Sequence, residues 1–378
     1  MVSSRPFAGL RIQTNVLLKP YTTFKIGGPA RYFAEIVTPQ DLEQALAFAR
    51  AERVKVFVLG GGSNVLISDR GFDGLVLHPV NDGLQVASEN AETVTLRVNA
   101  AETWDRVVAH AVERGWWGIE NLSHIPGQAG AGLVQNIGAY GAEIADVFES
   151  AEVMELATEE VNTLGIEDCG LAYRRSIFNA SRKGQFFIFG LTLKLTKQGR
   201  PKLDYPDVRT YFYQRGIERP TLDEIRHAII TIRDRKFPFP REEKGGNVGS
   251  FFKNLLLSKA EYEALEHNVA KNFSAGDLSK LQAIKRKFPA TGRIKIPTAF
   301  LMEICDLKRS EVGGAKVNES QPLVLLNQGG ATADNVLKLA GHVRRTIHGR
   351  TGMTVEIEPE LVGFAQDEVA GYLSLPSS

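Results

Sequence analysis

The chain has 378 residues, more than one compact core usually holds, so we expect two or three domains. Hydrophobic residues make up 43% and charged residues 24%, which excludes a disordered or fibrous protein. The 45 basic and 44 acidic residues give a net charge of +1. This balance offers no electrostatic reason to expect nucleic acid or a membrane surface as a partner.

Cysteine and histidine usage excludes two further classes of protein. Cys169 and Cys305 are the two cysteines, too few for a disulfide framework or an all-cysteine metal site, and they fit a reducing cytosol. The seven histidines show no paired spacing typical of metal ligands. The first 20 residues lack a signal-peptide pattern, and no stretch approaches the roughly 20 apolar residues that cross a bilayer. We therefore expect a cytoplasmic protein without a metal ion.

Hydrophobic periodicity predicts alternating strands and helices. Residues 39–54 predict a helix with one apolar face, and residues 221–236 predict a helix that Thr221 caps, with acidic residues in its first turn. The other predicted elements are strands at 31–37, 56–59, 64–68, 74–78, 93–100 and 186–195, helices at 104–113 and 334–347, and a strand-like segment at 354–364. Near residue 220 the pattern changes from strands and glycine-rich segments to helices, and we predict a domain boundary there.

A run of three glycines, followed by Ser63 and Asn64, comes directly after the predicted strand at 56–59. Consecutive glycines reach positive φ and let backbone N–H groups converge on an anion. The run is not a Rossmann fingerprint, because the third spaced glycine is missing and a strand follows it instead of a helix. The run is therefore either a phosphate-binding loop or a tight turn.

Residues 121–141 form a second segment rich in glycine and alanine. Such a backbone can pass close to a large ligand and hydrogen-bond it through its amides. The alternative is a long loop that packs through its glycines. Long loops without secondary structure are usually functional or disordered, and the apolar anchors Ile125, Val134 and Ile137 favour order. We therefore favour ligand binding.

Six motifs occur in a fixed order along the chain. They are TTFKIGGPA (22–30), VLGGGSN (58–64), IPG followed by QNIGAYG (125–141), YRRSIF (173–178), GNVGSFFKN (246–254) and EPEL (358–361). Together they resemble the UDP-N-acetylenolpyruvoylglucosamine reductases, also called UDP-N-acetylmuramate dehydrogenases, over about residues 15–364. The resemblance includes the type I subtype, which carries an extra loop with a tyrosine.

The resemblance implies an α+β fold. It consists of a vanillyl-alcohol-oxidase/PCMH-type FAD-binding fold of two lobes and a C-terminal α+β substrate-binding domain. We expect the first lobe at 1–80, the second lobe at 81–220 and the substrate-binding domain at 221–354. Residues 355–378 are expected to return to the first lobe.

The resemblance also implies an activity. It is the NADPH- and FAD-dependent reduction of UDP-N-acetylglucosamine enolpyruvate to UDP-N-acetylmuramate, for peptidoglycan synthesis. The order is ping-pong, with hydride from flavin N5. We expect non-covalent FAD, a small-molecule UDP-sugar as the partner, and a monomer. The implied FAD contacts are Gly60, Gly61, Gly62, Ser63, Asn64, Ile125, Pro126, Gly127, Asn136, Gly138, Ala139, Tyr140 and Gly141.

Hydride addition to the alkene pushes charge toward the substrate carboxylate, so a cation or donor must meet that charge. A proton must then reach the adjacent carbon. The resemblance assigns Arg174 and Glu360 to the carboxylate and Ser250 to the proton. From the residues alone, Arg174 and Arg175 could be a solvated basic pair, and Ser250 could cap a turn. Glu358 would share one face of a strand with Glu360, where a carboxylate is usually solvated.

Four further residues are implied to contact the substrate. Lys236 would face the UDP diphosphate as a point charge, and Asn254 and Gln321 would contact the nucleotide. Tyr205 is the candidate for the tyrosine that folds over the substrate, although Tyr211 and Tyr213 could be confused with it.

Two alternatives remain open. One is another flavin oxidoreductase of this fold that acts on an alcohol or sugar lactone, often with FAD attached through His or Cys. His124 lies in a suitable loop, but the serine, lysine and EPEL motifs have no reason to exist in such an enzyme. The other alternative is a non-catalytic protein that binds a UDP-sugar or a flavin.

Overall fold

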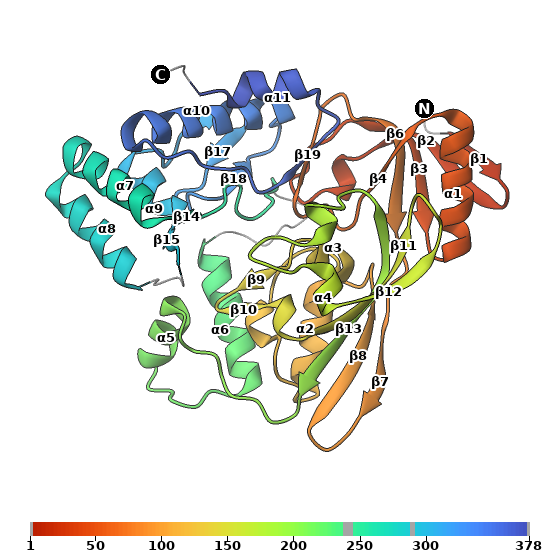
Figure 1. Ribbon diagram of the computed structural model, residues 1–378, viewed down its shortest axis with the longest axis horizontal. Helices are drawn as coiled ribbons and strands as arrows, with labels where there is room; N and C mark the ends of the chain where they lie inside the picture. The colour runs from red at the N-terminus through yellow and green to blue at the C-terminus, as the bar shows by residue number, and fades with distance from the viewer. Residues whose placement is uncertain (1–2, 237–244, 288–291, 376–378) are drawn as a thin grey trace. The chain divides into compact units, whose positions relative to one another are not determined.

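The computed structural model describes residues 3–236, 245–287 and 292–375 (Figure 1). The chain divides into two compact units. Among the described residues, unit 1 contains 3–16, 30–62 and 72–236, and unit 2 contains 17–29, 63–71, 245–287 and 292–375.

The first sheet of unit 1 has five strands in the order β1-β2-β3-β6-β4, with β3 and β4 both parallel to β6. Helix α1 (Pro39–Glu52) buries Leu42, Ala45 and Leu46 in the core of this sheet, as the periodicity predicts. Thr38 caps α1, because its hydroxyl accepts the N–H of Asp41 at 3.2 Å. The strands are β1 (Ser3–Phe7), β2 (Leu10–Leu17), β3 (Pro29–Ile36), β4 (Lys55–Val58) and β6 (Phe72–Pro79).

The second sheet of unit 1 is antiparallel, in the order β12-β11-β13-β8-β7. Helix α2 (Trp104–Glu113) packs against the core of this sheet through Trp104, Val107 and Val108, and its bounds are the predicted ones. The other elements are β7 (Leu84–Glu89), β8 (Thr93–Asn99), α3 (Ala129–Val134), β9 (Gly138–Ala139), β10 (Ala142–Glu143), β11 (Phe148–Glu155), β12 (Val161–Gly165), α4 (Ile166–Cys169) and β13 (Phe186–Thr196), with short 3-10 turns at Glu120–Leu122, Ile144–Asp146 and Ile177–Asn179.

Two helices complete unit 1, and they pack on each other. Helix α6 (Leu222–Lys236) buries Ile225 and Ile229 against Val208 and Phe212 of α5 (Pro206–Tyr213). The predicted cap of α6 is confirmed, because the hydroxyl of Thr221 accepts the N–H of Glu224 at 3.3 Å. The domain boundary near residue 220 stays a prediction, and in the structure α6 belongs to unit 1.

Unit 2 is organised around helix α10 (Ala333–Thr351), which is buried along its length through Val336, Ala340, Val343 and Ile347. Figure 1 shows α11 running beside it. Small sheets pair β14 with β15, place β17 between β16 and β18, and pair β5 with β19 in parallel. The elements are a 3-10 turn (Lys19–Tyr21), β5 (Val65–Ile67), β14 (Leu255–Leu257), α7 (Lys259–Asn272), α8 (Ala275–Lys287), β15 (Ile294–Ile296), α9 (Thr298–Ile304), β16 (Glu311–Val312), β17 (Ala315–Val317), β18 (Leu325–Asn327), β19 (Glu360–Val362) and α11 (Gln366–Leu373).

The C-terminal region differs from the sequence prediction. The helix predicted at 334–347 continues to Thr351 and ends at Gly352, whose φ of 73° forms a left-handed cap. The strand predicted at 354–364 is wrong in extent, since only 360–362 form one, and Pro359 cannot donate to a strand ladder. Helix α11 was not predicted. Among the residues that the structure describes, no helix is both long and apolar enough to cross a membrane.

Candidate functional site

The two glycine-rich segments lie against each other within unit 1. A Cβ atom at Gly61 would come 2.8 Å from the Cα of Gly127 and 3.0 Å from the backbone N of Gln128. At Gly60 it would come 3.1 Å from the side-chain oxygen of Gln128. At Gly61, where the neighbours are backbone atoms, only a residue without a side chain allows this close approach. Gly62, with φ of 60°, turns the chain just after the contact.

These residues fit the phosphate groups of a dinucleotide cofactor. Two backbone segments without side-chain bulk meet here, and glycine-rich backbone of this kind can present N–H groups to an anion. The structure thus brings Gly60 and Gly61 to Gly127. Ser63 and Asn64, which the sequence places in the same loop, belong to unit 2.

The end of the second segment is a tight hairpin. Strands β9 and β10 enclose Tyr140 and Gly141, which have φ of 49° and 84°. Positive φ at both central positions is typical of a type I′ turn, which matches strand twist. The amide of Asn121 donates to the carbonyl of Tyr140 at 2.8 Å and to that of Lys202 at 2.9 Å. Asn121 therefore fixes this turn to the segment that leads into α5.

Asn136, a predicted cofactor contact, is fully buried and braces the protein itself. Its Nδ2 donates to a carboxylate oxygen of Glu143 and to the carbonyl of Ala172, both at 2.9 Å. Its Oδ1 accepts the N–H of Ala145 at 3.1 Å. The side chain of Asn136 therefore shapes the loop, and contact with the cofactor stays a prediction for this residue.

Arg174 and Arg175 differ sharply in environment. They lie in a turn in which Ala172 and Arg175 exchange two backbone hydrogen bonds of 2.9 Å. Arg174 has φ of 53° and is half-buried, and its Nη2 donates to the carbonyl of Gly138 at 2.8 Å. Arg175 is exposed. The turn therefore directs Arg174, and not its neighbour, toward strand β9.

Tyr140, Tyr205, Asp207 and Lys236 form a group of side chains that we call the tyrosine cluster. The rings of Tyr140 and Tyr205 meet edge to face with centroids 5.2 Å apart. The Nζ of Lys236 lies 5.7 Å from the centre of the Tyr140 ring and forms an ion pair with Asp207. Of the other candidate tyrosines, Tyr213 is 85% exposed. Tyr211 packs against Phe212 and Arg215, so Tyr205 is the candidate tyrosine that contacts Tyr140.

Burial keeps both phenols of the tyrosine cluster neutral. It raises the pKa of Tyr140 to about 12. It also raises the pKa of Tyr205, and the charge of Asp207 and the neighbouring Tyr173 add to this effect. Both hydroxyls therefore remain hydrogen-bond donors at neutral pH.

A half-buried network of ion pairs and hydrogen bonds holds the backbone just before the IPG motif. Asp105 of α2 accepts the N–H of His124 at 2.5 Å and two parallel hydrogen bonds from Arg226 of α6 at 2.7 and 2.8 Å. Arg233, about two turns further along the same face of α6, donates to the carbonyl of His124 at 2.9 Å. The ring of His124 contacts Asp234 at 3.0 Å. The network therefore fixes both backbone polar groups of the residue that precedes Ile125.

The sequence reasoning missed this network. Its signal was the spacing of Arg226 and Arg233, which lie seven residues, or about two helical turns, apart and so on one face of α6. Burial by itself would raise the pKa of Asp105, but the hydrogen bonds from Arg226 and His124 outweigh it and leave the pKa lowered. Burial lowers the pKa of Arg233.

In unit 2, Ser250 begins a buried extended segment that is bonded on both sides. Ser250 forms a bridge with Val324, and the N–H of Phe251 donates to the carbonyl of Leu323 at 2.7 Å. On the other side, the N–H of Glu358 donates to the carbonyl of Phe251 at 2.9 Å. Both Phe251 and the next residue are fully buried. Backbone hydrogen bonds to two other segments therefore fix the chain at Ser250.

The two glutamates of EPEL connect different segments of unit 2. The N–H of Glu360 donates to the carbonyl of Asn64 at 2.9 Å, and the amide of Asn64 contacts the carbonyl of Glu358 at 3.5 Å. Both glutamates are half-buried. Asn64 thus holds the backbone on both sides of Pro359. These backbone bonds do not show which of the two carboxylates would contact the substrate.

The remaining substrate candidates also lie in unit 2. The Oδ1 of Asn254 accepts the N–H of Thr298 at 3.1 Å, which satisfies a free donor at the start of α9. Gln321 lies in a turn that the N–H of Val324 closes at 2.9 Å, and not at the head of a strand, because β18 begins at Leu325.

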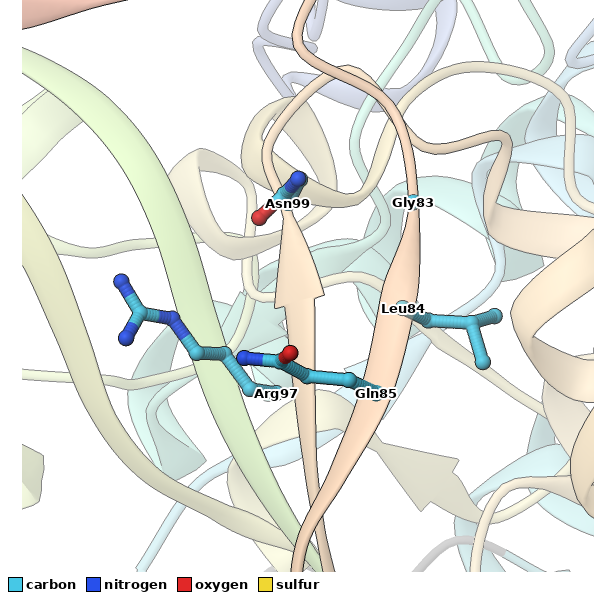
Figure 2. A pocket seen from close by; sticks show the side chains of 5 residues that line it. All are labelled: Gly83, Leu84, Gln85, Arg97 and Asn99. Atoms are coloured by element: carbon cyan, nitrogen blue, oxygen red, sulfur yellow. The ribbon is translucent and has the colours of Figure 1, made fainter.

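A hollow of about 450 Å³ lies elsewhere in unit 1, on strands β7 and β8 (Figure 2). Its lining residues are Gly83, Leu84, Gln85, Arg97 and Asn99, none of which is a predicted site residue. Their polar groups are engaged locally, since Arg97 pairs with Glu152 and Asn99 donates to the carbonyl of Asp82 at 2.8 Å. Within the described ranges, no group of three or more His, Cys, Asp and Glu side chains could hold a metal ion.

Two family models match the chain. Residues 30–165 match the model described as FAD binding domain. Residues 240–362 match the model described as UDP-N-acetylenolpyruvoylglucosamine reductase, C-terminal domain.

Curated relatives carry the name UDP-N-acetylenolpyruvoylglucosamine reductase. The one from Burkholderia multivorans is 38% identical, over 91% of this chain and 95% of the relative. The one from Pseudomonas fluorescens is 36% identical, over 93% and 98%. The one from Flavobacterium johnsoniae is 34% identical, over 93% and 100%.

The crystal structure of UDP-N-acetylenolpyruvylglucosamine reductase from Thermus caldophilus matches this fold. Its TM-score is 0.59 at 22% identity, over 96% of this chain and 100% of that chain. At this identity the likeness concerns the fold alone. With the FAD-binding match, it confirms the predicted α+β fold class of the vanillyl-alcohol-oxidase/PCMH type.

Replacing Gly61 by alanine is expected to weaken FAD binding about tenfold, roughly 1.4 kcal/mol. The new Cβ would press on the backbone of Gly127, which cannot yield without moving the second segment. Flavin fluorescence quenching on titration of the apoprotein measures the affinity. Gly349→Ala is the matched control, since a Cβ there meets nothing within 4 Å. Unchanged affinity in Gly61→Ala would remove this contact from the cofactor site.

Asp105→Asn is expected to lower the free energy of unfolding at pH 7 by about 3 kcal/mol, since it breaks a largely buried pair. The folded-state pKa lies below the ordinary value of 3.8, so the pair stabilises above that value. Its contribution is lost as the pH falls through the folded pKa. Urea unfolding at pH 7 and pH 3 should therefore show a smaller difference from the parent at pH 3. Asp73→Asn, in an exposed pair, should change little at either pH.

Proposed function

Because the chain belongs to the UDP-N-acetylenolpyruvoylglucosamine reductase family, we propose that it reduces UDP-N-acetylglucosamine enolpyruvate to UDP-N-acetylmuramate with FAD and NADPH. This reaction supplies peptidoglycan precursors. The observation that carries the proposal is the match along both parts of the chain, at 30–165 for the FAD binding domain and at 240–362 for the C-terminal domain.

FAD, when bound, accepts a hydride from NADPH and gives it to the substrate alkene. The residues that would hold it are those of the two glycine segments, around Gly61 and Gly127. We propose that no covalent bond attaches it. Both cysteines are buried, and burial raises the pKa of each thiol to about 11, which disfavours the reactive thiolate. The ring of His124 is engaged with Asp234.

Three residues would act on the enolpyruvyl group. As hydride adds to the methylene carbon, negative charge grows toward the carboxylate, where Arg174 and Glu360 would stabilise it. Arg174 can do this because its Nη2 bond to the carbonyl of Gly138 fixes its guanidinium. Ser250 would then transfer a proton to the carbon that bears the carboxylate. Its rigid backbone suits a donor that must point at one atom.

Four residues would bind the rest of the substrate. We propose that Tyr205 closes over the UDP-sugar, as in the type I subtype, and that Lys236 meets the diphosphate. Asn254 and Gln321 would contact the nucleotide. We further propose a cytoplasmic monomer that needs neither nucleic acid nor a membrane.

A purified sample tests the proposal directly. Acid or heat should release free FAD into the supernatant. Anaerobic NADPH should bleach the flavin absorbance near 450 nm, and UDP-N-acetylglucosamine enolpyruvate should restore it. Colour that stays with the precipitate would contradict non-covalent binding. A flavin that NADPH leaves oxidised but an alcohol or sugar lactone reduces would favour the oxidase alternative.

Ser250→Ala is expected to leave the rate of flavin reduction by NADPH unchanged. Reoxidation by the enolpyruvyl sugar should slow by about 10²–10⁴-fold, the usual cost of losing a positioned proton donor. Stopped-flow absorbance of the pre-reduced enzyme measures this step. A thermal melt is the control, because a serine that only forms the turn before Phe251 would lower stability and leave reoxidation fast. Ser250→Cys should retain partial activity, since a thiol can also give a proton.

A further inference from the structure

Lys236, which is proposed to bind the substrate diphosphate, forms an ion pair with Asp207. Asp207 lies in the first turn of α5, and Lys236 lies in the last turn of α6. The two helices pack through Val208, Phe212 and Ile229, so the pair joins elements that are already in contact. The Lys236 and Asp207 side chains are 28% and 41% exposed, so a ligand from solvent can reach both.

Asp207 also lies beside both aromatic members of the tyrosine cluster. Its charge contributes to the raised pKa of Tyr205 and of Tyr140, after burial in each case. Tyr205 is the residue that directly precedes α5, two positions before Asp207. Asp207 and the tyrosine that is proposed to close over the substrate are therefore neighbours at the start of α5.

The carboxylate of Asp207 opposes the binding of a phosphate ligand at Lys236, so its presence there calls for an explanation. It repels the diphosphate and shares the cation that the diphosphate needs. After losing Lys236, however, Asp207 would keep the favourable interaction of a carboxylate at a helix start. The diphosphate, which carries two negative charges, can thus replace Asp207 as the partner of Lys236 at a small cost in free energy.

We propose that Asp207 is a positioning and specificity residue that holds Lys236 in place of the diphosphate, and that the UDP-sugar displaces it from the lysine. The apolar contacts of α5 with α6 keep Tyr205 in place whether the pair is closed or open, so the exchange changes only the partner of the lysine. The pair makes entry depend on a ligand with enough negative charge to compete with Asp207. This inference rests on the proposed function.

Isothermal titration of the oxidised holoenzyme with UDP-N-acetylglucosamine enolpyruvate tests the exchange without turnover. Asp207→Asn is expected to bind about fivefold more tightly than the parent, because the competing charge is gone. Asp207→Glu retains that charge and should bind like the parent. Glu89→Gln, which breaks an exposed pair with Lys197 elsewhere in unit 1, should also bind like the parent.

The same substitution in a Lys236→Met variant distinguishes exchange of the ion-pair partner from simple repulsion of the ligand by Asp207. Lys236→Met should weaken binding, and adding Asp207→Asn to it should restore little, because the carboxylate then has no cation to release. Equal or weaker binding by Asp207→Asn overturns the inference, as does a gain that persists in full without Lys236. No binding by the parent enzyme would instead contradict the proposed function, so the two failures are distinguishable.

Discussion

The close backbone contact between residues 60–61 and 127–128 sets the requirements for much of unit 1. It demands glycine at Gly61, because a side chain there would overlap the Cα of Gly127. It also requires the IPG segment to stay in place, since movement of that segment would break the contact. The Asp105–Arg226 pair meets that demand by bonding the backbone of His124, and Arg233 bonds it from the other side.

The sequence predicts the framework of the fold because that framework depends on local patterns. The apolar face of α1, the bounds of α2 and the Thr221 cap of α6 each follow from residues close together in the chain. The C-terminal strand was predicted too long, because strand propensity does not register that Pro359 interrupts the ladder. Helix α11 spans only eight residues, none of them buried, so its pattern was too short to predict a helix.

Motifs supplied the candidate site residues, whereas contacts between residues far apart in the chain could not be predicted. The glycine segments, Arg174 and Ser250 stand in recognisable motifs. Asp105 and Asp207 do not, since each acquires its importance from a partner more than 25 positions away. Acidic residues are common in the first turn of a helix, so neither position stands out in the sequence. Each carboxylate gains its basic partner only because α2 or α5 packs against α6. The sequence also assigned Asn136 to the cofactor without indicating that its amide is committed to the protein.

The two parallel hydrogen bonds between Arg226 and Asp105 constrain how this protein can diverge. A lysine cannot reproduce the planar fork of arginine, and an asparagine cannot balance its charge. A change at one position therefore leaves a largely buried charge without its counterpart, and a second change must accompany it. Among related chains, these two positions should covary, held as a matched acid and base or replaced together by apolar residues of similar volume.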